Sequence, residues 1–258
     1  HIEKLEPWGE KEKNSENVPD DVKPRFILQT SLGEVACHSV VVATGGLSIP
    51  TMGATGLGYD VAKQFGLRVK PRYASLVPFT FKDHQHMPLL SMMQSLAGVA
   101  LPVSVSCQNQ SFSEALLFTH KGLSGPAILQ ISSYWTAGSH ININLAPKTD
   151  ILNELKLARE TSPRQSPKVW LSQYLPSRLA EYITSYIKQI RLADMNDKAL
   201  INLALMVNKW HVKPAGTEGF RTAEVTKGGV DTKELSSKTM EAKNVPGLYF
   251  IGEVVDVT

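Results

Sequence analysis

The feature that most constrains this chain is a run of β-branched residues that ends in glycine. Residues 40–42 are three valines; ATGG follows at 43–46 and GATGLG at 53–58. A short apolar run that stops at glycine is typical of a strand buried on both faces and followed by a tight turn. Residues 59–69 then place apolar side chains at helical spacing, with Gly66 where a helix would end. The stretch predicts a buried strand, a glycine-rich loop and a short helix.

The glycine loop does not match the dinucleotide-binding fingerprint. That fingerprint is G-x-G-x-x-G, whereas Gly53, Gly56 and Gly58 have the spacing G-x-x-G-x-G. None of the 18 glycines forms the fingerprint. Two interpretations stay open. In the first, backbone N–H groups ahead of the helix that starts near Tyr59 bind an anion. In the second, the glycines only make tight turns.

The rest of the chain changes from strand to helix and back to strand. Residues 25–44 predict a hairpin, and residues 76–149 contain short alternating segments that indicate a β-barrel or sandwich. From 150 to 212 the apolar spacing is helical, and Pro176 predicts a break. Residues 220–226 and 247–257 read as strands again, with Gly228-Gly229 as a turn. The sequence therefore predicts a mixed α/β (α+β) protein in which one domain interrupts another.

Composition excludes several classes of protein. Hydrophobic residues make up 42% and charged residues 20% of the 258 residues, which is an ordinary globular profile. The net charge is only +3 and the basic residues are scattered, so we expect no nucleic-acid partner. Cys37 and Cys107 are too few and too far apart for a disulfide framework, and we expect no metal. Residues 3–21 are a polar lead-in and no apolar run could span a bilayer, so we expect a cytoplasmic protein without a membrane partner.

Segments along nearly the whole chain resemble one flavoprotein family. They are ATGG at 43–46, Pro50 with GATG at 53–56, LVP at 76–78, LLFTHKGLSGPAIL at 116–129, AEVTKGGV at 223–230, TME at 239–241 and GLYFIGEVVDV at 247–257. The chain is similar to the BaiN-like, or aminoacetone oxidase-like, bacterial flavoproteins, which bind FAD. The family's opening glycine fingerprint and its C-terminal tail have no counterpart in the sequence, so the chain resembles an internal fragment.

The resemblance implies a set of cofactor-binding residues near the two ends of the chain. ATGG at 43–46 would let the backbone pass close to FAD, because side chains there would push the cofactor away. Gly252 would place a backbone N–H, and Glu253 a carboxylate, near the ribityl chain. Residues 226–230 would turn beside the isoalloxazine. Without the resemblance, Glu253 fits a solvated strand end and Gly228-Gly229 a hairpin turn. The implied set is Ala43, Thr44, Gly45, Gly46, Thr226, Gly228, Gly229, Val230, Gly252, Glu253 and Asp256.

No catalytic residue stands out, because a flavin accepts the hydride while the protein supplies orientation and electrostatics. His120 is a candidate proton donor, although a lone histidine in a turn is more often structural. Tyr59 and Arg221 are further candidates. The segment GLSGP at 122–126 is no serine-hydrolase elbow, which needs glycine where Pro126 stands. Pro126 instead predicts the first turn of a helix with Ser124 as its cap.

These expectations combine into one domain scheme. Residues 1–75 and 217–258 would form parts of an incomplete, Rossmann-like FAD-binding domain. Residues 76–216 would be an inserted substrate domain, β-rich over 76–149 and helical over 150–212. The resemblance implies that the intact protein is an FAD-dependent oxidoreductase acting on a small organic substrate, with NAD(P)H compatible as electron donor. The oligomeric state is left open.

The alternative is a nonenzymatic protein- or RNA-binding module on a flavoprotein-derived scaffold. Lys188 and Arg191 lie beside aromatic residues in the helical segment, but these charges are too few for a nucleic-acid face. The aromatic stripe at the same spacing fits a hydrophobic core; it consists of Trp170, Tyr174, Tyr182 and Tyr186.

Overall fold

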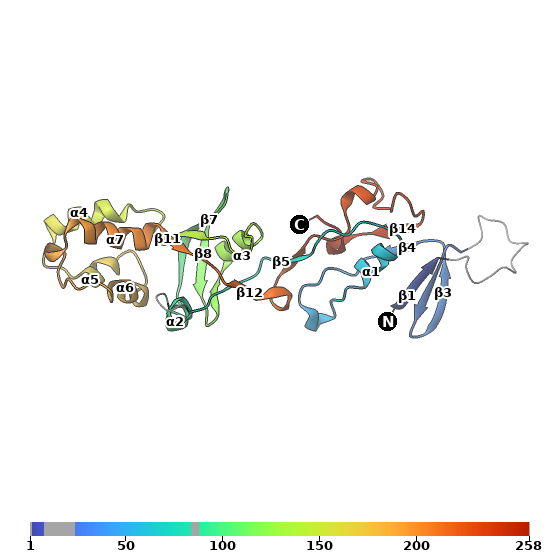
Figure 1. Ribbon diagram of the computed structural model, residues 1–258, viewed down its shortest axis with the longest axis horizontal. Helices are drawn as coiled ribbons and strands as arrows, with labels where there is room; N and C mark the ends of the chain where they lie inside the picture. Colours follow the sequence, from blue (N-terminus) through green and yellow to red (C-terminus); the bar gives the residue numbers. More distant parts are fainter. Residues whose placement is uncertain (1, 8–23, 84–87, 258) are drawn as a thin grey trace, which may run out of the picture. The chain divides into compact units, whose positions relative to one another are not determined.

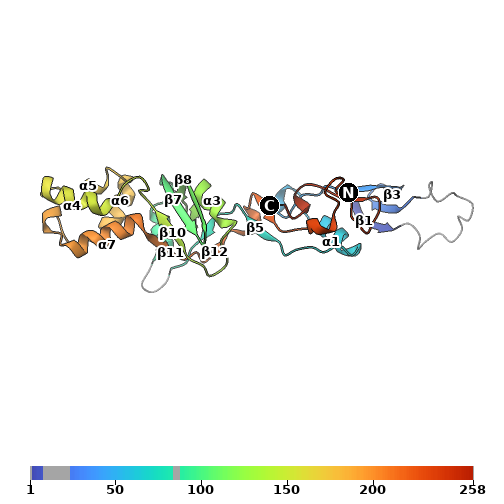
Figure 2. The same ribbon diagram turned by 90° about the horizontal axis from the view of Figure 1, so that it is seen from above.

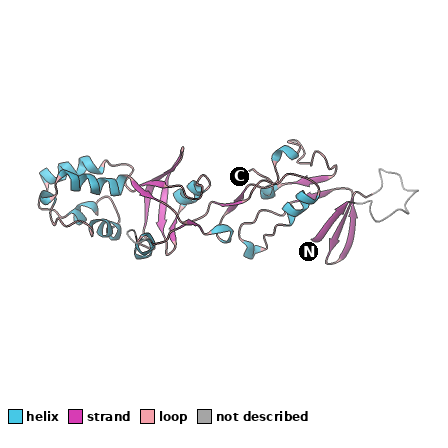
Figure 3. Cartoon of the chain, viewed as in Figure 1, coloured by secondary structure: helices cyan, strands magenta, loops and turns pink. Residues whose placement is uncertain are grey.

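The computed structural model describes residues 2–7, 24–83 and 88–257, and the chain divides into two compact units. The first unit combines the residues up to Ala74 with those from Val225 onward, and the second runs from Ser75 to Glu224. Helices and strands are mixed in the chain (Figure 1, Figure 3), which confirms the predicted mixed α/β class.

A three-stranded antiparallel sheet opens the first unit. It contains β1 (Ile2–Pro7), β2 (Phe26–Thr30) and β3 (Gly33–Cys37), and a tight turn joins the last two strands. The Thr30 hydroxyl stabilises this turn by donating to the Gly33 carbonyl at 2.8 Å. The predicted polar lead-in is wrong for residues 4–7, which pair with β2. Residues 8–21 of that lead-in lie outside the described residues.

A parallel strand pair forms the centre of the first unit. The valine run becomes β4 (Val40–Val42), which pairs in register with β14 (Leu248–Phe250). The hairpin predicted over 25–44 is confirmed for β2 and β3. Its second strand is shorter than predicted, because β3 ends at Cys37 and β4 takes a different partner. The strand is also not buried on both faces, since Val41 is 57% exposed while Val42 is buried.

The helix predicted after the glycine loop is confirmed as α1 (Leu57–Gln64). It follows a short turn, η1 (Pro50–Met52). Gly66 ends it with φ 77°, and the Leu67 N–H donates to the Ala62 carbonyl at 2.9 Å. This pattern is a Schellman motif, which needs a residue that tolerates positive φ. The loop from Gly53 to Gly56 therefore leads into a helix with a well-defined end.

The late part of the chain contributes short elements to the first unit. These are β13 (Val225–Lys227), which pairs with β5 (Tyr73–Ser75), then η4 (Thr232–Glu234) and η5 (Gly252–Val254). The strand predicted at 220–226 is only partly present, because η3 (Gly219–Arg221) occupies its first two residues and β13 begins at Val225. The predicted turn at Gly228-Gly229 is wrong: β13 and β14 pair with different strands.

A seven-stranded sheet, joined by antiparallel pairs, forms the β-rich part of the second unit. Its strand order is β11-β10-β7-β8-β9-β6-β12. The strands are β6 (Phe79–Thr80), β7 (Ala100–Cys107), β8 (Gln110–Phe118), β9 (Gly122–Ser124), β10 (Ile141–Asn144), β11 (Trp210–Val212) and β12 (Gly216–Thr217). Two short helices accompany it, α2 (Leu89–Ser95) and α3 (Pro126–Ser132).

The start of α3 shows why a glycine replaces the expected cap. Pro126 does occupy the first turn, but the cap is Gly125, not Ser124. Gly125 has φ 92°, and a Cβ there would lie 2.8 Å from the Ala115 carbonyl oxygen. The close approach of β8 therefore requires glycine at the position where the helix begins.

The predicted helical segment contains four helices, which gather beside β10 and β11 (Figure 1, Figure 2). The prediction is wrong for its last residues, 210–212, which form β11. Asp150, Ser166 and Asn196 cap three of them with their side-chain oxygens. Pro176 stands directly before the third, as its predicted break requires. The helices are α4 (Ile151–Thr161), α5 (Pro167–Leu171), α6 (Ser177–Thr184) and α7 (Asp197–Asn208), with η2 (Leu192–Asp194) before the last.

One hydrophobic core joins the strands and helices of the second unit. It runs from Phe79 to Val212 and includes Trp170, with Tyr174 and Tyr182 packed against it. The core prediction is wrong for Tyr186, which is 62% exposed. The aromatic stripe therefore begins in the core and ends at the surface.

Candidate cofactor site

The parallel pairing of β4 and β14 brings two predicted segments to one edge. Because the strands run in the same direction and in register, their carboxyl ends lie side by side. ATGG follows β4 at residues 43–46, and Gly252 and Glu253 follow β14. The carboxyl edge of parallel strands is where open α/β sheets bind ligands.

Helix α1 lies beside β4 (Figure 1). Gly58 is the residue through which the helix packs against this edge. A Cβ on Gly58 would lie 2.3 Å from the Thr44 Oγ1 and 2.8 Å from a methyl of Val254. Such distances are shorter than real Cβ contacts, so only glycine lets the helix approach both strand ends. Sequence reasoning missed this role, although a glycine in the first turn of a helix, where it lowers helix propensity, was a usable signal.

Thr226 connects three chain segments at the edge. Its Oγ1 accepts the Leu47 N–H at 2.8 Å, and its own N–H donates to the Glu253 carboxylate. A Cβ on Gly46 would lie 2.5 Å from that same Thr226 oxygen. The structure therefore brings together Gly46, Thr226 and Glu253, and it explains Gly46 by packing within the protein.

Two other glycines face open space. Gly45 has φ 72° and Gly252 has φ 75°, and a Cβ on either would meet nothing within 4 Å. Their conformation favours glycine, and the space next to them is free for a ligand to approach the backbone. Both positions belong to the set that the flavoprotein resemblance implied.

Two buried hydroxyl groups at the edge lack hydrogen-bond partners among the described residues. They are the Thr44 Oγ1 and the Tyr59 hydroxyl. An unsatisfied buried polar group costs about 1–3 kcal/mol, so such groups call for an explanation. A cofactor rich in hydroxyl and phosphate oxygens, such as FAD, would supply the missing partners, and in this respect the residues fit it.

Tyr59 is held in its protonated form. Its side chain is fully buried, and burial raises the pKa of the phenol, as does the negative charge of Glu253. The Arg72 guanidinium, 4.9 Å from the ring centroid, acts in the opposite direction. The phenol is therefore a hydrogen-bond donor at neutral pH.

Gly228 and Gly229 let two backbone segments cross closely. A Cβ on Gly228 would lie 2.0 Å from the Pro71 carbonyl oxygen, and one on Gly229 would lie 2.6 Å from that of Val254. Val230 is buried, and its N–H donates to the same Val254 carbonyl at 2.9 Å. The contacts made by these three residues are backbone packing beside the edge.

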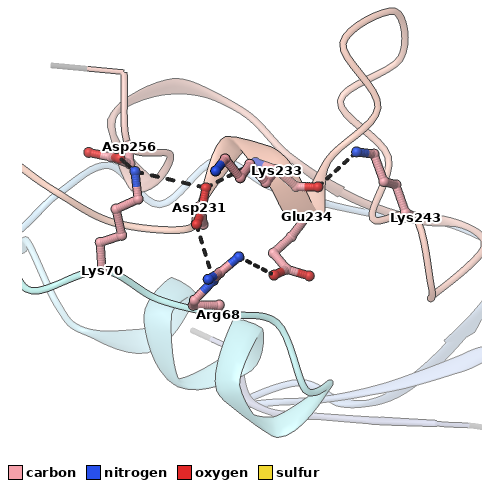
Figure 4. A network of polar contacts seen from close by, with 7 residues as sticks. All are labelled: Arg68, Lys70, Asp231, Lys233, Glu234, Lys243 and Asp256. Carbon is pink, nitrogen blue, oxygen red and sulfur yellow. Dashed lines mark hydrogen bonds and ion pairs between the residues drawn. The ribbon is translucent and has the colours of Figure 1, made fainter.

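Asp256 belongs to a network of charged residues (Figure 4). Its carboxylate pairs with Lys70 at 2.5 Å, and Lys70 also lies 3.9 Å from Asp231. Asp231 is 3% exposed and pairs with Arg68 at 3.1 Å. The Lys233 N–H holds the pKa of Asp231 below its usual value, with Lys70 and Arg68 acting in the same direction against burial. Sequence reasoning missed Asp231, whose signal was an acid directly after the apolar end of AEVTKGGV.

The other catalytic candidates lie in the second unit. His120 is exposed in the turn between β8 and β9, which the Thr119 hydroxyl closes by accepting the Gly122 N–H at 3.1 Å. Arg221 is exposed at the end of η3. Ala43, the remaining member of the implied set, is exposed directly after β4.

The fold and its matched segment define the class of protein. The family model described as HI0933-like protein barrel and H2TH domain matches residues 73–225. The chain belongs to this HI0933-like family, and the matched segment is the barrel and helical part of the second unit.

Three relatives are similar to the chain over nearly its whole length. It is 52% identical over 236 residues to a protein of Escherichia coli and 46% identical over 246 residues to one of Haemophilus influenzae, both named ribosomal RNA dihydrouridine synthase. These matches cover 90% and 94% of the chain, and 58% and 60% of the relatives. A 3-dehydro-bile acid delta(4,6)-reductase of Clostridium scindens is 24% identical over 249 residues, covering 90% of the chain and 59% of the relative. The chain thus spans about three-fifths of the length of these relatives.

The relatives correct one expectation. The expected absence of a nucleic-acid partner is wrong, because the relatives at 52% and 46% identity are both named for ribosomal RNA. A small net charge over the whole chain does not exclude an RNA partner, because phosphate contacts depend on where the basic residues lie. The BaiN-like resemblance corresponds to the more distant relationship at 24% identity. Within the described residues no helix has the length and apolarity to cross a membrane.

Proposed function

We propose that the complete protein is a flavin-dependent enzyme that reduces uridine in ribosomal RNA to dihydrouridine. The observation that carries this proposal is the 52% identity to a relative named ribosomal RNA dihydrouridine synthase. The edge formed by β4 and β14 supports it, because its buried hydroxyls and open glycines suit a flavin dinucleotide. In this proposal the first unit is part of the FAD-binding domain and the second is the substrate domain.

The residues of the edge divide by what they would contact. Gly45 and Gly252 would let the backbone approach the cofactor closely. The Tyr59 phenol and the Thr44 hydroxyl would donate to its oxygens, while the second oxygen of Glu253 would accept from ribityl hydroxyls. A bound flavin supplies hydride-transfer chemistry. His120 stays a candidate proton donor, and Asp256 a candidate contact, only as part of this proposal.

An RNA substrate is favoured over the small organic substrate that the sequence suggested. The relatives named for ribosomal RNA are 46–52% identical, whereas the bile acid reductase is 24% identical. The nonenzymatic RNA-binding alternative shares this partner and differs only in lacking catalysis. An enzyme that acts on ribosomal RNA would work in the cytoplasm. No relative's name mentions a nicotinamide donor, so NAD(P)H is not part of the proposal.

The proposal is tested by a direct assay of the modified nucleoside. The full-length protein is incubated with unmodified ribosomal RNA and chemically reduced FAD, and the RNA is digested and analysed by mass spectrometry. We expect dihydrouridine in the RNA, and much less with Glu253→Ala. RNA binding without any dihydrouridine would instead support the nonenzymatic alternative.

A further inference from the structure

Two grooves flank the C-terminal half of α6. One, of about 370 Å³, is lined by residues that include Lys168, Thr184 and Gln189. The other, of about 300 Å³, is lined by residues that include Arg178 and Tyr182. Both grooves share Glu181 and Ser185. We call the two grooves, together with the exposed residues Tyr186 and Ile190, the α6 surface.

The α6 surface presents an aromatic ring to solvent in a fixed position. Tyr186 is 62% exposed, and its ring lies edge-on to that of Tyr182 with centroids 5.6 Å apart. The Tyr186 hydroxyl donates to the Tyr182 hydroxyl at 2.8 Å, and Tyr182 packs against the core. Ile190, at the end of the first groove, is 79% exposed. A rigid exposed ring beside apolar surface is suited to stacking on a flat ligand.

The chain segment that contains α6 has a positive net charge. Residues 147–213 contain 11 lysines and arginines against six aspartates and glutamates, a net charge of +5, whereas the whole chain has +3. Three of the six acids are in ion pairs: Glu181 with Lys168, Asp194 with Arg191, and Asp197 with Arg159. Arg178 is exposed and donates to the carbonyl groups of Ser95 and Ala97. The segment is therefore complementary to a polyanion.

We propose that the α6 surface binds an unpaired stretch of RNA, with a base stacked on Tyr186 and the backbone phosphates near Lys168 and Arg178. The inference rests on the proposed function, since it concerns how the same RNA substrate is held. Single strands favour this arrangement because their bases are free to stack on aromatic side chains. A duplex hides its base faces and would leave Tyr186 without a partner.

The test measures RNA binding by full-length variants. Tyr186→Ala should weaken binding of protein-free ribosomal RNA about tenfold, because the loss of one base stack costs roughly a factor of 5 to 150. Tyr186→Phe keeps the ring and should bind within about twofold of wild type. Tyr134→Ala is the matched control, since Tyr134 is also exposed, at 44%, and contacts one other ring, Phe112. Thermal melting checks that each variant is folded.

Salt dependence provides a second readout. If Lys168 neutralises a phosphate, Lys168→Gln should reduce the slope of log affinity against log salt by about 0.7. Tyr186→Ala should leave the slope unchanged, because stacking releases no counterions.

Three results would overturn the inference, and each leads to a different conclusion about the proposed function or the binding partner. If wild type binds RNA and Tyr186→Ala binds equally well, the inference fails and the proposed function stands. If wild type binds no ribosomal RNA, both fail. If Tyr186→Ala loses affinity for ribosomal particles but not for protein-free RNA, the α6 surface contacts a ribosomal protein.

Discussion

Thr44 and Thr226 are the same residue type at the same edge, yet their hydroxyls have different surroundings. The Thr226 Oγ1 accepts the Leu47 N–H at 2.8 Å, whereas the Thr44 Oγ1 is buried without a partner among the described residues. A buried hydroxyl with a partner stabilises the fold, and one without a partner destabilises it. In the proposed site, Thr226 therefore has a structural role, and Thr44 would bind the cofactor.

Replacing each threonine with valine tests this difference. Without FAD, Thr44→Val should leave the free energy of unfolding unchanged or raise it by up to about 1 kcal/mol, because an unsatisfied oxygen is removed. The same variant should bind FAD about tenfold more weakly. Thr226→Val should lower the free energy of unfolding by about 1–2 kcal/mol through the unpaired Leu47 N–H. Denaturant unfolding with and without FAD measures both; equal FAD affinity in Thr44→Val would remove Thr44 from the site.

Glu253 offers a second test at the residue scale. Glu253→Ala removes the acceptor of the Thr226 N–H and, in the proposed site, an acceptor for ribityl hydroxyls. We expect FAD affinity to fall about tenfold or more, which corresponds to roughly 1.4 kcal/mol or more. Glu253→Gln keeps one acceptor oxygen and should lose less than about threefold. Quenching of flavin fluorescence gives both affinities, and wild-type affinity in Glu253→Ala would refute this role.

At the scale of elements, Gly228 determines how closely the segment after β13 approaches residues 71–72. A Cβ there would lie 2.0 Å from the Pro71 carbonyl oxygen, at φ 88°. Gly228→Ala should therefore lower the free energy of unfolding by about 3 kcal/mol or more, from steric overlap added to backbone strain. Gly33→Ala is the control, because Gly33 also has positive φ but open space, and it should cost only about 1–2 kcal/mol. Equal losses in the two variants would mean that the Pro71 contact does not matter.

The Asp231 network connects elements far apart in sequence, and it makes the stability of the fold depend on pH. Because the pKa of Asp231 is lowered in the folded state, its carboxylate stabilises the fold above the unfolded pKa of about 3.9. This stability is lost as pH falls through the lower folded pKa. Asp231→Asn should therefore reduce the melting temperature by a few degrees at pH 7, and the difference should vanish in strong acid. Melting curves of both proteins from neutral to acidic pH check this; a pH-independent difference would contradict it.

Much of the element order follows from the sequence, because periodicity and breakers act locally. The helices after residue 150, the break at Pro176 and the end of α1 at Gly66 each depend on neighbouring residues only. The pairing of β4 with β14 was not predictable in this way, since its partners are about two hundred residues apart.

The candidate site, too, was predictable from the sequence only in part. The resemblance indicated Thr44, Gly45, Gly252 and Glu253, and it explained the glycines at 45 and 46 only by closeness to the cofactor. Gly46 and Gly58 are explained only by the three-dimensional packing of Thr226, Thr44 and Val254 against them. Tyr186 shows the opposite error: its helical spacing fitted a core, but the chain leaves α6 just before it. Spacing predicts which face a residue shares, and not where a helix ends.

At the scale of the whole molecule, the two units carry different parts of the proposed reaction. The first unit provides the edge of β4 and β14, where backbone and hydroxyl groups would hold a flavin. The second unit provides the barrel and helical segment of the HI0933-like family, with its net positive charge. Cofactor binding and RNA binding should therefore respond to separate substitutions: Thr44→Val should not alter RNA affinity, and Tyr186→Ala should not alter FAD affinity.

The most direct test of the central claim is a visible absorption spectrum of the full-length protein after incubation with excess FAD and desalting. We predict flavin bands that stay with the protein and weaken in Thr44→Val and Glu253→Ala. A folded full-length protein without flavin bands would contradict the claim that the carboxyl edge of β4 and β14 is a flavin site.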